Sequence, residues 1–400
     1  MAEGFDPTTF NPHDPGFIAE PWPTYALFRD HAPVAPVKPY NANWVFRYHD
    51  VAEVLTDTDR FVKNPPGGPV PSPGPYGMMA AFPQGLFISD PPRHTQLRAV
   101  LEPALRTAIA DAPAIASDYA QPLVEKARAS GRMELVADYA LPVPANVLFT
   151  ILGIPDDPVM RAGLLAWQGA IATAHDITQS PGVRVNGATC GMALRTYLTG
   201  LIRRCQKDPA SAGGMLAVVV PEISPDLTLE AVAASFQDLV VAGYLSTTWL
   251  IASGMRQLLT NPAELELLRA QPDLIHGAVE EMLRYDDPVQ VVDRVAAVDT
   301  EIGGVALKAG DKLGLVVGSA DHDPSAFDAP EEFRISRENA GRMGFGAGIH
   351  HCIGAPLVQL MAPVALAALL ELPGLAVDGL AQWQTDPYLR GMVNLPVRLG

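Results

Sequence analysis

The segment from Phe345 to Gly354, Phe-Gly-Ala-Gly-Ile-His-His-Cys-Ile-Gly, constrains this chain more than any other part of its sequence. Two glycines, Gly346 and Gly348, precede Cys352, and an apolar helical pattern begins directly after Gly354. A cysteine at a helix start lies near backbone N–H groups and the helix dipole, which both stabilise a thiolate. Glycines let the backbone approach a flat partner closely. The pattern therefore predicts a tight loop that presents a thiolate.

Two other interpretations of this loop are possible. Cys352 could be a buried structural cysteine in a turn. Alternatively His350, His351 and Cys352 could bind zinc, but three adjacent residues cannot easily surround one tetrahedral ion, and no CxxC pair or second histidine pair supports such a site. The chain has only three cysteines, so a disulfide framework is not expected.

Composition and charge narrow the class of protein. Hydrophobic residues make up 48% of the 400 residues and charged residues 18%, which is enough for a large buried core. The net charge of −16 argues against nucleic acid or an anionic membrane surface as a partner, because each repels an acidic protein. The first 15 residues lack an apolar run and a basic start, and the uncharged stretch 239–255 fits a core helix better than a membrane span. We therefore expect a cytoplasmic protein.

The chain between Pro91 and about Gly374 is mainly helical in pattern. Thr228 is the expected N-cap of a long apolar helix that reaches about Leu259. Extended structure is expected at Trp44–Tyr48, in Val295–Gly318 and as a final strand pair within 374–400, and a short helix is expected to begin within Asp50–Leu55. The segment 64–85 is dense in proline and glycine, and its apolar side chains favour a loop that packs over something apolar.

Taken with its cysteine loop, the sequence resembles the cytochrome P450 family. The family's haem-binding loop is Phe-Gly-x-Gly, three residues, Cys, one residue, Gly, and the segment 345–354 matches every fixed position. The resemblance runs along most of the chain. It implies one haem domain over residues 1–400, mainly α (α+β) with small β-sheets, and haem b (iron protoporphyrin IX) as cofactor. It also implies Cys352 as the axial iron ligand, with Phe345, Gly346, His350 and Gly354 in the cofactor-binding loop.

A second motif supports the resemblance. Glu281 and Arg284 are three residues apart on a helical stretch, so they share a face and can pair. They match the family's ExxR motif, and Arg337 stands where the family has an arginine that completes this structural network.

Four residues resemble the family's donors to the haem carboxylates. His94 and Arg98 are four residues apart on one predicted helix face, Arg294 follows Pro288, and His350 lies two residues before the cysteine. Cationic donors suit buried carboxylates because charge-assisted hydrogen bonds are strong.

The predicted long helix departs from the family pattern. The family usually has Ala-Gly, one residue, an acid and then threonine. Here the run is Ala242-Gly243-Tyr244-Leu245-Ser246-Thr247, so Leu245 replaces the acid and Ser246 stands at the alcohol, with Thr247 as a substitute. Ala242 and Gly243 would leave space for dioxygen. Without the acid, proton delivery could use water, use a group of the substrate, or be bypassed with peroxide.

Asp238 lies one turn before Ala242 on the same helix face, which should point into the substrate pocket. Because a buried carboxylate needs a donor, we expect Asp238 to bind a polar or cationic group of the substrate; a surface position is the alternative. The family's other substrate contacts fall here on apolar residues, which implies a compact, mostly hydrophobic substrate: Met78, Met79, Phe82, Val241, Ala242, Val291, Val292 and Met392.

The resemblance implies a monooxygenase that inserts one atom of O2 into a small organic molecule. Because the chain is short and has neither a flavin domain nor a nucleotide-binding glycine motif, the resemblance also implies a separate ferredoxin and its reductase as electron donors. Two alternatives stay open: a peroxide-driven or non-oxygenating haem enzyme on the same fold, and a non-catalytic haem-binding or sensing protein.

Overall fold

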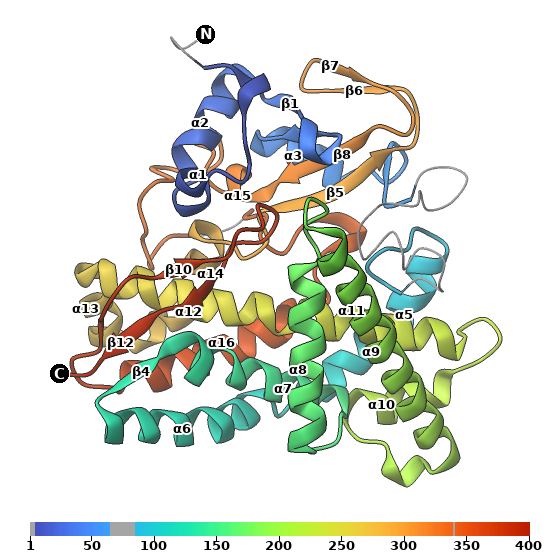
Figure 1. The fold of residues 1–400 in the computed structure, drawn as a ribbon, viewed down its shortest axis with the longest axis vertical. Helices are drawn as coiled ribbons and strands as arrows, with labels where there is room; N and C mark the ends of the chain where they lie inside the picture. The colour runs from blue at the N-terminus through green and yellow to red at the C-terminus, as the bar shows by residue number, and fades with distance from the viewer. Residues whose placement is uncertain (1–4, 65–84, 339–340) are drawn as a thin grey trace.

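The computed structural model describes residues 5–64, 85–338 and 341–400, and helices dominate it (Figure 1). None of the helices in these ranges is long and apolar enough to cross a lipid bilayer. The α-helices are α1 Pro15–Ala19, α2 Trp22–His31, α3 Tyr48–Thr56, α5 Arg93–Ala108, α6 Ala112–Ser130, α7 Pro142–Leu152, α8 Pro158–Thr173, α9 Pro181–Lys207, α10 Gly214–Val219, α11 Leu229–Gly243, α12 Leu245–Thr260, α13 Pro262–Ala270, α14 Ile275–Tyr285, α15 Val317–Ala320 and α16 Ala355–Leu370.

The strands form small sheets, and the expected mainly helical architecture with small β-sheets is confirmed. The largest sheet has the order β1-β2-β8-β5-β3 and lies with α1–α3 at one end of the molecule (Figure 1). Within it, β2 and β8 are parallel and the other neighbouring pairs are antiparallel. The strands are β1 Val34–Val37, β2 Ala42–Val45, β3 Phe61–Val62, β4 Arg132–Glu134, β5 Val291–Ala296, β6 Thr300–Ile302, β7 Val305–Leu307, β8 Lys312–Val316, β9 Ala376–Val377, β10 Gln382–Trp383, β11 Met392–Asn394 and β12 Pro396–Arg398.

The extended segments agree with the sequence in kind and differ in detail. Short strands do occupy most of 295–318, although β5 already begins at Val291 and α15 takes the last two residues. The expected strand pair within 374–400 is confirmed, because β10 pairs with β11 and β9 pairs with β12. The strand β12 also pairs with β4, so the last two strands, β11 and β12, belong to different sheets.

The predicted long helix is two helices. Thr228 caps α11 as expected, since its side chain accepts a hydrogen bond from the backbone N–H of Ala231. The helix then breaks at Tyr244, whose φ and ψ are −104° and −32°, and α12 follows without a side-chain cap. The break falls within the segment that the family resemblance places beside iron.

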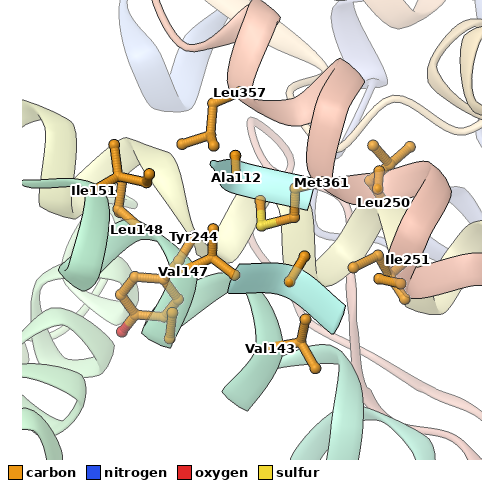
Figure 2. Close-up of a cluster of buried hydrophobic side chains, with 14 of the residues drawn as sticks. Ala112, Val143, Val147, Leu148, Ile151, Tyr244, Leu250, Ile251, Leu357 and Met361 are labelled. Carbon is orange, nitrogen blue, oxygen red and sulfur yellow. The ribbon is translucent and has the colours of Figure 1, made fainter. Parts of the chain in front are cut away.

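The break is embedded in the largest hydrophobic core of the described chain. Figure 2 shows the Tyr244 side chain near Val147 and Leu148 of α7, with Leu250 and Ile251 of α12 in the same cluster. Leu357 and Met361 of α16 complete it from the other side. The helix that follows the cysteine loop and the helix that follows the break therefore pack into one core, which fixes the loop relative to the break.

Candidate active site

The cysteine loop has the backbone that its glycines predict. Gly346 and Gly348 both adopt a φ of +67°, which L-residues with side chains rarely adopt. A Cβ on Gly348 would lie 2.7 Å from the carbonyl oxygen of Leu55, so only glycine allows this close approach to α3. The N–H of Cys352 donates to the carbonyl of Phe345 at 2.8 Å and closes the loop.

The Cys352 sulfur lies just before the first turn of α16. Burial raises the pKa of the thiol above its usual range, while hydrogen bonds from the backbone N–H groups of Gly354 and Ala355 act in the opposite direction. These N–H groups are the donors that the helix-start pattern predicts for a thiolate. In the described ranges no group of three or more His, Cys, Asp and Glu side chains is arranged to hold a metal ion, so the zinc interpretation gains no support.

Glu281, Arg284 and Arg337 lie together behind this loop. Glu281 and Arg284 are completely buried and form two hydrogen bonds of 2.8 Å, and Arg337 donates to the same carboxylate at 3.2 Å. The backbone N–H of Arg334 donates to Glu281 at 2.9 Å. Arg284 also donates to the carbonyls of Asp321 and Pro330, so one guanidinium ties α14 to the chain that leads into the cysteine loop.

The residues predicted to donate hydrogen bonds to the haem carboxylates also lie near the loop. His94 and Arg294 are 2% and 4% exposed, and the rings of His94 and His350 lie 4.4 Å apart. Burial lowers the pKa of His94, of His350 and of Arg294, the last to about 10, and neighbouring cations lower the two histidines further. Arg98 instead donates to the carbonyls of Ile349 and of the residue before Cys352, and pairs with a carboxylate on its own helix.

One cation of this group is absent from the sequence interpretation. Lys63, directly after β3, donates through Nζ to the carbonyl of Asp293 at 3.3 Å, and Arg294 donates to the same oxygen at 2.8 Å. Burial and the neighbouring Arg294 lower the pKa of Lys63 to about 7. No motif marks this lysine. The pairing of β3 with β5 places Lys63 beside Arg294, a residue far from it in sequence.

The alcohols after the break bond to the backbone. Ser246 Oγ donates to the carbonyl of Ala242 at 2.8 Å, and Thr247 Oγ1 donates to that of Gly243 at 3.1 Å. Ser246 is half-buried, whereas Thr247 is 1% exposed. Ala242 is exposed although Tyr244 is buried, so the helix presents an accessible surface at the expected dioxygen position.

Comparison with known proteins decides the family. A cytochrome P450 family model matches residues 215–378. The cytochrome P450 monooxygenase PikC of Streptomyces venezuelae is 34% identical over 396 residues, covering 96% of this chain and 92% of that protein. The chain belongs to the cytochrome P450 family. It is therefore a monooxygenase-type oxidoreductase whose cofactor is haem b with a thiolate-ligated iron.

Other relatives agree. The biotin biosynthesis cytochrome P450 of Bacillus subtilis (strain 168) is 30% identical, covering 95% of this chain and 96% of that protein. The crystal structure of CalO2 has a TM-score of 0.87 at 26% identity and covers 98% of this chain and 99% of that one. P450BioI, crystallised with an acyl carrier protein carrying hexadec-9Z-enoic acid, also has a TM-score of 0.87, at 28% identity, over 96% of this chain and all of that one.

The residues of this P450 fit a haem. Its two propionates are anionic, and the site offers two cations that lack an anion, the half-buried Lys63 and the buried Arg294: among the described residues, neither has a carboxylate oxygen within 4 Å. The buried Nε2 of His94 likewise has no hydrogen-bond partner within the described structure. The donor set therefore suits a group with two carboxylates next to a thiolate ligand.

Asp238 has a partner that the sequence did not suggest. Its Oδ2 accepts a hydrogen bond from the backbone N–H of Phe87 at 3.1 Å, and a Cβ on Gly85 would lie 2.2 Å from the same oxygen. Ser235, one turn earlier, accepts from the N–H of Leu86 at 3.1 Å. Burial raises the pKa of Asp238 to about 7. The half-buried carboxylate thus anchors the segment 85–87 on α11, and a protein donor meets the need that had been assigned to substrate.

The remaining pocket residues have different surroundings. Val241 and Val292 are half-buried, whereas Val291 and Met392 are 3% and 0% exposed and pack in hydrophobic clusters. Met78, Met79 and Phe82 lie outside the described residues. The role of this set toward substrate stays a prediction.

Proposed function

We propose that this P450 inserts one oxygen atom from O2 into a small, mostly hydrophobic organic molecule, with electrons from a separate ferredoxin and its reductase. The observation that carries the proposal is the break in the distal helix, where the exposed Ala242 adjoins apolar side chains and a hydroxyl. When bound, the haem supplies the electron transfer and dioxygen activation. We keep the cytoplasmic location as a prediction of the same kind.

The chain's own residues would position the substrate and supply a proton beside the haem. Ser246 holds its hydroxyl proton toward the carbonyl of Ala242, and a change of rotamer would release that proton for a bound ligand. Leu245 and Val241 supply apolar surface that excludes water from the same place. Asp238 keeps its predicted contact with a polar or cationic substrate group, which would compete with its bond to the Phe87 N–H.

The test is reconstitution with defined electron donors. We expect NADH, ferredoxin and ferredoxin reductase to support product formation from hydrophobic ligands that shift the spin state, and one labelled oxygen atom from O2 to enter the product. No product with any such ligand and electron donor would favour the haem-binding or sensing alternative and overturn the proposal.

One observation favours a second function, a peroxide-driven enzyme on the same fold. Leu245 places a hydrocarbon where the family usually has an acid, so no side chain there can relay a proton. Turnover with hydrogen peroxide alone, and none with NADH and electron carriers, would establish this second function. If dioxygen is the oxidant, we expect Leu245→Glu to raise the ratio of dioxygen-driven to peroxide-driven turnover.

A further inference from the structure

Lys63 is held in place by a carboxylate that is far from it in sequence. Asp90, just before α5, accepts the backbone N–H of Lys63 and that of Asn64, both at 2.8 Å. The side chain of Asn64 donates to the same carboxylate at 3.2 Å. The carboxylate oxygens of Asp90 therefore accept from backbone and amide donors, and these bonds fix the end of β3 beside the start of α5. The Lys63 ammonium does not bond to Asp90.

The ammonium is directed to the edge of β5. It shares the carbonyl oxygen of Asp293 with the guanidinium of Arg294, at 3.3 and 2.8 Å. On its other side the ring centroid of Phe87 lies 4.6 Å away. Two cations that donate to one neutral oxygen repel each other at short range, and an aromatic face offsets only a small part of that repulsion.

The described residues supply no ion-pair partner for either cation. Asp90 and Asp293 act on Lys63 only from beyond ion-pair distance. The neighbouring segment 65–84 contains no Asp or Glu in its sequence, so it cannot supply a carboxylate either. A buried guanidinium beside a half-buried ammonium is costly unless an anion compensates their charges.

We infer that Lys63 is a further haem-binding residue of this P450, a cationic donor that shares a haem carboxylate with Arg294. The His94 and His350 rings lie in the same cluster, and both histidines are affected electrostatically by Arg294. Lys63 is thus the one member of the cluster that belongs to none of the sequence motifs. The inference rests on the haem cofactor alone and is independent of the proposed substrate and electron donor.

The alternative explanation is that Lys63 is structural and that its contacts with the Asp293 carbonyl and the Phe87 ring are its whole role. Substitution separates the two, because a structural lysine does not interact with haem and its loss would not change how firmly haem is held. The variants are Lys63→Met, which keeps the length and removes the charge, and Lys63→Arg, which keeps the charge. Lys126→Met is the matched control, since Lys126 is exposed on α6 and its side chain lies 3.9 Å from Asp138.

The readout is the rate of haem transfer from the ferric holoprotein to an excess of apomyoglobin. A hydrogen bond between charged groups accounts for about tenfold or more in an equilibrium, so we expect Lys63→Met to lose haem about tenfold faster than wild type. Lys63→Arg should stay within about threefold of wild type, and Lys126→Met should be unchanged. Equal rates for Lys63→Met and Lys126→Met would overturn the inference, as would Lys63→Arg losing haem as fast as Lys63→Met.

A second measurement is needed if Lys63→Met is purified without haem. Circular dichroism then establishes whether the haem-free chain is folded, and haem titration compares its affinity with that of haem-stripped wild type. Weaker binding by a folded variant supports the inference, and equal binding overturns it. In variants that retain haem, removing a cation beside the carboxylate should also make the iron midpoint potential more negative, an effect that a purely structural lysine would not produce.

Discussion

Replacing Glu281 by glutamine removes one charge from an ion-pair network whose central pair, Glu281 and Arg284, has no exposure to solvent. Glu281 and Arg284 are both completely buried, and Arg337 adds a second cation to the same carboxylate. Breaking one partner of a buried ion pair costs about 3–5 kcal/mol of unfolding free energy, because the remaining charge stays buried without compensation. Glutamine keeps one oxygen that can accept from Arg284 or from the Arg334 N–H, so we expect the lower end, about 3 kcal/mol.

The assay is urea unfolding followed by far-ultraviolet circular dichroism, together with the haem content of the purified protein. With an m-value of about 3 kcal/mol/M, that loss lowers the urea midpoint by about 1 M. Glu53→Gln is the control: Glu53 pairs with Arg60 at 2.6 Å but is 45% exposed, and such pairs contribute about 0–1 kcal/mol. If the unfolding free energy of Glu281→Gln lay within about 1 kcal/mol of that of the control, and the variant kept full haem content, the network would not stabilise the fold as its burial indicates.

Three further predictions follow from single residues. Cys352→Ser should lose the red-shifted Soret band of the reduced carbon monoxide complex; a retained band would exclude Cys352 as ligand. Gln168→Leu should shift the infrared stretch of bound carbon monoxide more than Tyr244→Phe does, because Gln168 bonds both the Val241 carbonyl and the Tyr244 hydroxyl, whereas Tyr244→Phe removes only the second bond; equal or absent shifts would contradict this. Burial raises the pKa of folded Asp238 from 3.8 to about 7, so its contribution to stability falls as pH rises through that window. Asp238→Asn, which can still accept from Phe87, should gain melting temperature relative to wild type from pH 5 to pH 7.5, and a constant difference would refute that pKa.

The site features that the sequence predicts are those whose partners lie within one loop or one helical turn. The Phe345–Gly354 loop, the Glu281–Arg284 pair and the Thr228 cap depend on separations of three to nine residues, which a pattern can encode. The hydrogen bond from Lys63 to the Asp293 carbonyl, which brings the lysine beside Arg294, spans 230 residues, and the anchoring of Phe87 by Asp238 spans 151. Those separations leave no period or motif in the chain.

The helix break at Tyr244 is a second feature that the sequence did not predict. A disrupted helix normally leaves unpaired carbonyls, whose cost should show as polar residues at the break. Here the hydroxyls of Ser246 and Thr247 bond back to the carbonyls four residues earlier, and Gln168 of α8 donates to the carbonyl of Val241 at 2.8 Å. Gln168 also accepts from the Tyr244 hydroxyl at 3.1 Å, so one side chain from another helix bonds to the last turn of α11 and to the residue at the break.

One of the compensating bonds comes from Gln168 of another helix, and the others are bonds from hydroxyls to carbonyls four residues earlier, which Ser and Thr also form in an unbroken helix. The sequence pattern therefore predicts one helix. In this chain the residues that shape the helix break differ from the residue that stands at the position of the family's acid. The shape of the distal segment depends on Gln168 and on the backbone-bonded alcohols, and none of these contacts involves the side chain at Leu245. We therefore expect Leu245→Glu to leave the fold of the break unchanged.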